Sequence, residues 1–338
     1  MSIPLLFLLA GCYPFFETVD EACEDGVPGN ADDVDAEELY QRVNCYRRVA
    51  RMKPGQVNRR AQDAAEYHVL YLENVHGEEY TFDSLHPLLE DDTLGQPFTG
   101  VTVWERLEYQ GYPITTASHW IWEFWDTDAF EAFMPLDQLV DEVWITNPYW
   151  RQAMLHPGWR AAGHATTQHW RYGLIIADLP SRAHASRPIV YPADGQTGLP
   201  LTWTTYAFEI GDGLPIAKEV GLPITVHVGG ETYSGGHNNP YELVFDAGSL
   251  HGPDGELPFY PVEPDATPSD LDLPSTVIMV PMDPLEPDTT YTATFQISWN
   301  DNWRKDVETT FTTAPAGSGQ AARVEPPMPP PVLRRPTW

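Results

Sequence analysis

Two histidines in residues 61–77 are the first side chains of this sequence whose type and spacing suggest chemistry. His76 is followed by Gly77, a typical helix C-cap, so the imidazole of His76 can point into a cleft instead of a core. His68 falls on an apolar stripe with spacings i, i+3, i+4, i+7 and i+8, which predicts an α-helix with His68 buried and hydrogen-bonded. His76 is therefore the candidate functional histidine.

Common catalytic motifs are missing from the rest of the sequence. It contains no Gly-x-Ser-x-Gly nucleophile motif, no His-Glu-x-x-His and no Gly-rich phosphate loop. The acidic runs 17–24 and 32–38 lack the alternating ligands and the glycine of a calcium loop, which indicates solvated surface. A thiol nucleophile is not expected, because each of the three cysteines has a structural role in the interpretation below.

The N-terminus, MSIPLLFLLAGC, predicts export. The apolar run of residues 3–10 is too short to span a bilayer and is typical of the end of a secretory signal, although no Lys or Arg precedes it. The motif LAGC at residues 9–12 resembles a bacterial lipobox, in which Cys12 would carry the lipid anchor; the alternative is an ordinary cleaved signal. Cys23 and Cys45 remain, and two cysteines of an exported chain most simply form one disulfide.

Charge and length limit the classes of function. The formal net charge of -30 argues against nucleic-acid binding, which relies on clustered Lys and Arg, and against peripheral binding to anionic lipids. The acidity is typical of an exposed or secreted protein that stays soluble. A chain of 338 residues predicts two or three domains.

The chain divides into helical and β-rich parts. After a signal over residues 1–12 and an acidic tether over residues 13–35, helical patterns begin near residue 35 and give way to strands between residues 163 and 179. Helices first and strands late predict an α+β or α/β/α layered domain over residues 36–182. Short β runs separated by turn residues predict a β-sandwich over residues 188–314, and the PPMPPP segment predicts a disordered, Pro-rich tail over residues 315–338.

Residues 36–182 resemble the CAP superfamily (cysteine-rich secretory, antigen 5 and pathogenesis-related proteins), in its bacterial SCP-like form. The resemblance rests on short motifs in a fixed order, which are VNCYR at 43–47, AAEYHVLYLENVHGE at 64–78, FTG at 98–100, ER at 105–106, GY at 111–112 and VDEVWITNPYWR at 140–151. It implies an α/β/α sandwich with a cleft that holds two histidines and two acidic residues, a set able to bind a divalent metal such as zinc.

The resemblance also implies which residues occupy that cleft. His76 matches the first family histidine, and Glu123 matches the following glutamate, with His119 as its rival. The second family histidine is replaced by Trp150, which has no lone pair for a metal. We therefore expect no bound metal and no cofactor, with His76 and Glu123 as the candidate ligands if zinc binds, and a cleft lined by Trp150.

Residues 188–314 resemble the immunoglobulin-like modules that follow CAP domains in some bacterial envelope proteins. The motifs are YPADGQ at 191–196, LEPDTTY at 285–291, which leads into a predicted strand, and TTFTT at 309–313.

Three functions follow from these patterns. The favoured one is a non-enzymatic lipoprotein of the bacterial cell envelope that binds a small apolar ligand or an envelope component through the CAP cleft. It would be anchored by lipid in the outer membrane or at the cell surface, or else be secreted. The first alternative is a metal-dependent hydrolase that uses His76 and Glu123. The second is an adhesion or scaffold protein that acts through the immunoglobulin-like domain.

Overall fold

The structure is a computed structural model that describes residues 15–24, 34–77, 90–94, 96–115, 119–127, 134–178, 188–205, 218–228, 243–263, 276–299, 303–317 and 332–334. The proposed anchor Cys12 and most of the predicted tail lie outside these residues.

A four-stranded antiparallel sheet with the order β15-β1-β3-β2 forms the centre of the first part of the chain. Its strands are β1 (His119–Thr127), β2 (Trp159–Thr166), β3 (Trp170–Asp178) and β15 (Val332–Arg334). The apolar strand β3 is buried along nearly its whole length because helices cover both faces of the sheet.

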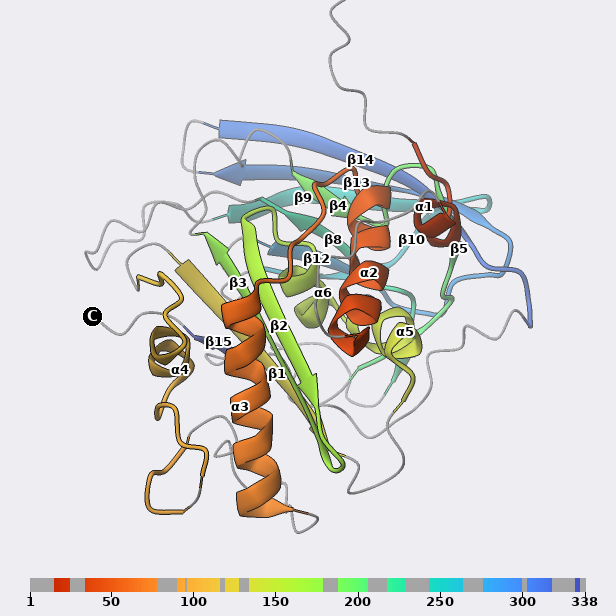
Figure 1. The fold of residues 1–338 in the computed structure, drawn as a ribbon. Coiled ribbons are helices and arrows are strands. Elements are labelled where there is room, and N and C mark those ends of the chain that lie inside the picture. Colours follow the sequence, from red (N-terminus) through yellow and green to blue (C-terminus); the bar gives the residue numbers. More distant parts are fainter. Residues whose placement is uncertain are drawn as a thin grey trace, which may run out of the picture.

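Helices pack on the two faces of this sheet (Figure 1). One face carries α3 (Arg59–His76) and α4 (Val103–Tyr109); the other carries α2 (Val34–Val49), α5 (Leu136–Gln138), the π-helical turn η2 (Leu139–Trp144) and α6 (Pro148–Met154). The alanines on α3 let it approach β2 so closely that a Cβ at Gly163 would collide with the carbonyl of Ala61. This close contact fixes α3 on the sheet.

The second part of the chain contains two larger sheets and a short two-stranded one. The first has the order β10-β9-β13-β14-β5 and the second β11-β12-β8-β4. Their strands are β4 (Ile189–Tyr191), β5 (Gln196–Leu199), β8 (Ile224–His227), β9 (Leu243–Gly252), β10 (Gly255–Leu257), β11 (Phe259–Val262), β12 (Thr276–Pro281), β13 (Thr290–Trp299) and β14 (Trp303–Thr313), with β6 (Trp203–Thr204) and β7 (Glu219–Val220) as the short pair.

The two parts share one hydrophobic core. Buried residues of α2, η2 and α6 belong to the same cluster as buried residues of β8, β12, β13 and β14. Arg151 on α6 crosses the boundary, since its Nη1 donates to the carbonyl of Pro223 at 2.7 Å. The rings of His156 and His227 also meet across it, with centroids 5.3 Å apart. The predicted domains are therefore packed directly on each other.

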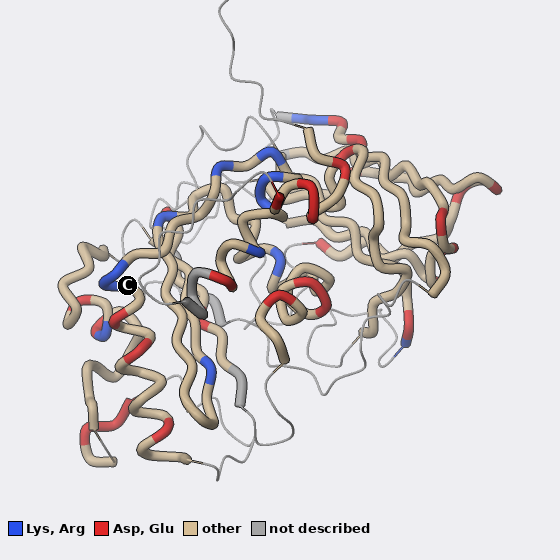
Figure 2. The backbone as a smooth tube through the Cα atoms, turned by 45° about the vertical axis from the view of Figure 1, so that its right-hand side comes forward, with Lys and Arg blue, Asp and Glu red and all other residues tan. Residues whose placement is uncertain are grey.

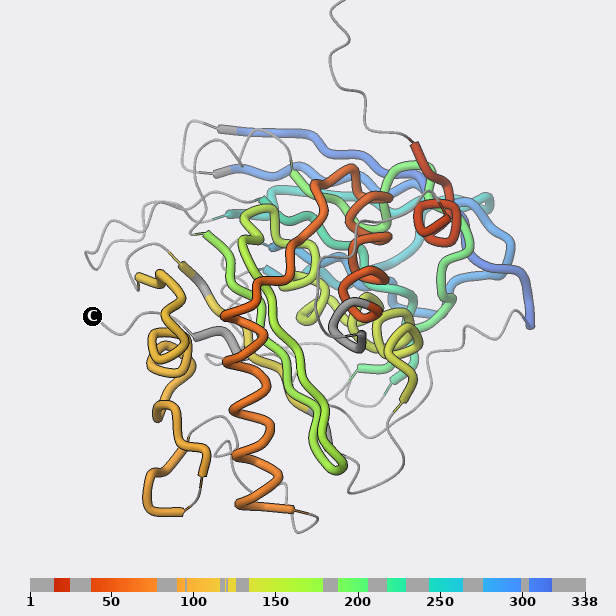
Figure 3. The backbone as a smooth tube through the Cα atoms, viewed as in Figure 1, coloured from red at the N-terminus to blue at the C-terminus, as the bar shows by residue number. Residues whose placement is uncertain are grey.

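The mixed α+β class and the disulfide between Cys23 and Cys45 are confirmed. The predicted tether is wrong for residues 15–24, because α1 (Val19–Glu24) packs beside α2 (Figure 3). The disulfide fastens α1 to α2. The predicted disordered tail is wrong for residues 332–334, which pair with β1. None of the helices in the described ranges is long and apolar enough to cross a membrane.

Candidate functional site

The predicted cleft residues do not converge, because the central sheet separates them. Trp150 is fully buried and stacks on Trp144, with ring centroids 5.5 Å apart and planes at 6°. It also contacts Phe124, at 5.8 Å. Adjacent residues of a strand point to opposite faces, so Phe124 and Trp150 lie on one face of the sheet and Glu123 on the other. The expectation that Trp150 lines a cleft with Glu123 is wrong.

His76 and His119 lie toward opposite ends of β1. The half-buried ring of His76 is 5.8 Å from that of Trp170, which pairs with the last residue of β1. His119 begins the strand, with its Nε2 3.8 Å from Asp178. Glu123 stands four residues from either end of β1, or about 13 Å along the strand. The geometry therefore does not bring His76, His119 and Glu123 into one site.

Glu123 belongs instead to a buried polar network under α3 and α4. Its Oε1 accepts hydrogen bonds from Nη2 of Arg106 at 2.5 Å and from the hydroxyl of Tyr172 at 2.6 Å. The ring of Tyr172 meets that of His68 edge-on, with centroids 4.5 Å apart. Nδ1 of His68 lies 3.1 Å from Oε1 of Glu90. His68 is thus the hydrogen-bonded core histidine that the sequence predicts. It joins the network of Glu123 through the ring of Tyr172.

Burial sets the protonation states in this network. Burial and the charge of Arg106 lower the pKa of His68 to about 4, so the imidazole is neutral at pH 7. Burial alone would raise the pKa of Glu90, but hydrogen bonds from His68 and from the backbone of Thr99 hold it below its ordinary value. Neutral His68 therefore donates Nδ1–H to an ionised Glu90.

The network connects several helices and strands, and its role is to stabilise their packing. Its side chains are at most 2% exposed, and they connect α3, α4, β1, β3 and the segment before α4. A buried ion pair with hydrogen bonds on both partners fixes geometry and is costly to break on one side. Across the part of the chain that the structure describes, no three His, Cys, Asp or Glu side chains gather closely enough to hold a metal ion.

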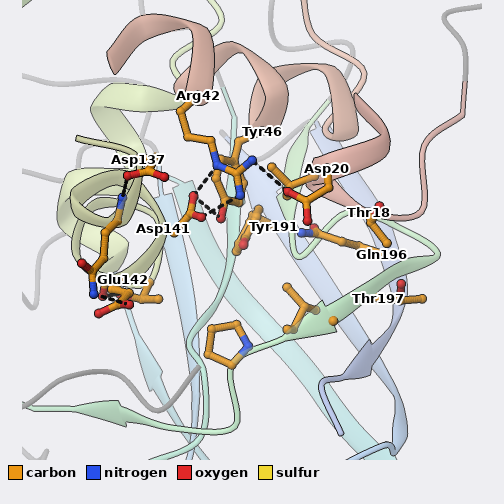
Figure 4. Close-up of a pocket in the computed structure, with 16 residues that line it drawn as sticks. Thr18, Asp20, Arg42, Tyr46, Asp137, Asp141, Glu142, Tyr191, Gln196 and Thr197 are labelled. Carbon is orange, nitrogen blue, oxygen red and sulfur yellow. Dashed lines mark hydrogen bonds and ion pairs between the residues drawn. The ribbon is translucent and has the colours of Figure 1, made fainter. Parts of the chain in front are cut away.

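A pocket of about 290 Å³ lies where the two parts of the chain meet (Figure 4). Its walls come from α1 with the residue before it, from α2, from α5 and η2 with the turn that follows, and from β4, β5 and the residue after β5. The lining residues are Thr18, Val19, Asp20, Arg42, Tyr46, Asp137, Gln138, Asp141, Glu142, Thr146, Tyr191, Gln196, Thr197, Gly198, Leu199 and Pro200.

Arg42 is the hub of this pocket. Its Nε and Nη2 donate to the two oxygens of Asp141, at 2.7 and 2.6 Å, and its Nη1 donates to Asp20 at 2.9 Å. The hydroxyl of Tyr46 donates to Asp141 at 3.1 Å. Burial would lower the pKa of Arg42, but the bond to Asp141 and its charge outweigh burial and raise it. One cation thus joins α1, α2 and η2.

Two tyrosines form an aromatic surface in the pocket. The rings of Tyr46 and Tyr191 have centroids 6.2 Å apart. Burial raises the pKa of Tyr191 to about 12, against the opposing charge of Arg151, whose guanidinium lies 4.4 Å from the ring of Tyr191. The phenol of Tyr191 therefore stays protonated at neutral pH.

The carboxylates of Asp137 and Glu142 form another wall. Oδ1 of Asp137 accepts from the backbone N–H of Gln138, and Oε1 of Glu142 accepts from the side-chain amide of Gln138, both at 2.8 Å. Within the described residues neither carboxylate has an ion-pair partner. This wall therefore carries negative charge that the protein itself does not neutralise.

The sequence patterns do not indicate this pocket. Arg42 and Asp141 are 99 positions apart, and Tyr46 and Asp141 belong to two separate motifs, at 43–47 and 140–151. Arg106 belongs to the ER motif at 105–106 and Glu90 to no motif, and neither is predicted as a buried partner, because single charges on helices and loops are ordinary surface features. Nothing in the sequence pattern shows which charged positions face each other.

No protein-family model matches this chain, and no curated protein is significantly similar to it.

Proposed function

We propose that this protein is a non-enzymatic binding protein of the cell envelope that holds a small polar ligand in the pocket between its two parts. The single observation that carries the proposal is the pocket itself, a space of about 290 Å³ with polar and aromatic walls from both parts. Small-molecule sites are commonly concave and lie at domain junctions with a few convergent polar groups.

The proposal includes the two domain types that the motifs suggest. Residues 36–182 are proposed as a CAP-like domain, and helices on both faces of the central sheet support this. Residues 188–314 are proposed as an immunoglobulin-like sandwich, supported by the two larger sheets. The Cys23–Cys45 disulfide supports an oxidising, extracytoplasmic compartment, with Cys12 proposed as a lipid anchor.

We place the ligand in the pocket around Arg42 and not in the predicted CAP cleft, because two of the side chains expected in that cleft, Trp150 and Glu123, are buried. Trp150 packs in the shared core, and Glu123 is hydrogen-bonded to Arg106 and Tyr172. Exposing either side chain to a ligand would require breaking buried packing or a buried ion pair. The open, polar pocket around Arg42 has no such cost.

A thermal-shift panel tests this function. The full-length protein is melted with amino acids, monosaccharides, amino sugars and diamines at millimolar concentration, since a ligand that binds only the folded state raises the Tm. A Gln138→Trp variant adds an indole to the pocket wall, and Tyr109→Trp is its control on the exposed face of α4. We expect at least one compound to stabilise the wild type and Tyr109→Trp but not Gln138→Trp. A panel without such a compound contradicts the function.

A further inference from the structure

We infer that the ligand of the pocket between the two parts is a small organic cation, with an ammonium or guanidinium group on a neutral polar body about the size of one monosaccharide or one amino acid. This inference rests on the proposed binding function and specifies its ligand. It depends on how charge is distributed over the pocket walls.

The charged groups at the centre of the pocket already bind one another. Asp141 receives two hydrogen bonds from Arg42 and one from Tyr46, and Asp20 receives one from Arg42. A carboxylate with three hydrogen bonds at 2.6 to 3.1 Å has little capacity left for a ligand. This centre holds α1, α2 and η2 in place and leaves recognition to the other walls.

The wall of Asp137 and Glu142 lacks a positive charge to balance its two carboxylates, within the described part of the chain. Each carboxylate accepts from a neutral N–H of Gln138, and within the described part of the chain neither lies within ion-pair distance of a cation. Four carboxylates face one guanidinium among the lining residues, an excess of three negative charges, which the buried Arg151 behind Tyr191 reduces to two. A bound cation would balance charge that the protein leaves unbalanced.

The remaining walls suit a neutral polar body. Thr18 and Thr197 lie across the pocket from Asp137 and Glu142, as Figure 4 shows. Their hydroxyls can accept or donate hydrogen bonds without adding charge. The pocket volume of about 290 Å³ is at the lower end for small-molecule sites and fits one sugar or amino acid.

Acidic residues recur around the whole molecule, as Figure 2 shows, and the net charge of -30 attracts any cation weakly. A specific site must therefore be distinguished from this general field. General attraction is screened by salt over about 8 Å at physiological ionic strength, whereas direct contacts in a partly enclosed pocket are screened less.

Calorimetric titration of the full-length protein with glucosamine and with glucose at physiological salt tests the inference, because the two sugars differ only in an ammonium group at one position. We expect glucosamine to bind about tenfold or more tightly than glucose, as a charge-assisted hydrogen bond contributes. The Asp137→Asn, Glu142→Gln double variant should lower glucosamine affinity to the level of glucose. Glu108→Gln removes an exposed charge on α4 and should leave both affinities unchanged.

Other outcomes separate this inference from the proposed function. Equal affinity for the two sugars, or full glucosamine binding by the double variant, overturns the cation inference. If neither sugar binds, but the panel yields a neutral or anionic ligand whose effect Gln138→Trp abolishes, the inference is wrong and the proposed function stands. If no compound depends on the pocket, both are wrong.

Discussion

Glu123 and Arg106 form a buried ion pair whose two partners depend on each other. Replacing Glu123 by Gln keeps the shape of the side chain but leaves the guanidinium of Arg106 buried without its countercharge. We expect a loss of about 3–5 kcal/mol in the free energy of unfolding, measured by urea denaturation. A Glu123→Leu, Arg106→Leu double variant should be more stable than Glu123→Leu alone. Additive losses for the two leucine substitutions would contradict the coupling.

Two buried histidines make the protein labile to acid. Burial lowers the pKa of His68 to about 4 and that of His164 to about 3, with the charges of Arg106 and Arg171 as the second causes. An unfolded histidine has a pKa of about 6.5. Below that pH these histidines bind protons in the unfolded state but stay neutral in the folded state. The free energy of unfolding therefore falls as the pH drops from about 6.5 toward 4.

Replacing His164 tests this pH dependence. The two ring nitrogens of His164 are buried, and within the described chain neither has a hydrogen-bond partner. His164→Leu should therefore remove one titrating group, and the variant should gain about 2 kcal/mol relative to the wild type between pH 7 and pH 5. Parallel urea curves at the two pH values measure this difference. A wild-type-to-variant difference that does not change with pH would disprove it.

The predicted burial of His68 was confirmed, whereas the predicted place of Trp150 in a cleft was wrong. Local sequence determines the first, and tertiary packing determines the second. Helical periodicity places His68 on the inner face of α3, and burial then demands a hydrogen bond, so the sequence was sufficient. The position of Trp150 depends on which face of a sheet α6 covers. That is decided by packing against β1 and against the second part, which no local pattern encodes.

At the scale of elements, α1 is the wall of the pocket that depends on the disulfide. Cys23 ends this six-residue helix together with Glu24, and Cys45 fastens it to α2. Nη1 of Arg42 donates to both Asp20 and Sγ of Cys23, at 2.9 and 3.3 Å. So short a helix is not stable alone, and the disulfide and Arg42 keep it in place.

Removing the disulfide should therefore affect both stability and binding. The Cys23→Ser, Cys45→Ser variant should lose about 3 kcal/mol of stability, from the entropy of a loop with a sequence separation of 22. It should also bind glucosamine more weakly, because Asp20 and Thr18 leave the pocket wall. Calorimetric titration and urea denaturation measure the two effects. Unchanged affinity in the variant would show that α1 is not part of the site.

Most elements were predictable, and their contacts were not. The apolar stripe in residues 61–77 predicted α3, and the strand expected after LEPDTTY at 285–291 is β13. The aromatic segment of β1 carries large side chains at adjacent positions, which hide the alternation typical of a strand. The disulfide followed from cysteine counting, whereas the docking of α1 followed from pairings far apart in the sequence.

At the scale of the whole molecule, the two parts act as one unit. Arg151 donates hydrogen bonds to both parts of the chain. Its Nε and Nη2 donate to the carbonyls of Ile145 and Thr146, before α6. Its Nη1 donates to the carbonyl of Pro223 and to the hydroxyl of Thr225, at the start of β8. With a shared core, we expect a single calorimetric transition for the full chain, with equal calorimetric and van't Hoff enthalpies. Two separate transitions would contradict the shared core.

The ligand should bind in the pocket between the two parts and not beside His76, and a titration of three proteins distinguishes the two places. Glucosamine is titrated into the wild type, into Gln138→Trp and into His76→Ala, which changes the predicted cleft without touching the pocket between the two parts. We predict that Gln138→Trp loses binding and that His76→Ala binds like the wild type. Loss of binding in His76→Ala with binding retained in Gln138→Trp would place the site on the other face of the central sheet and rule out the pocket around Arg42.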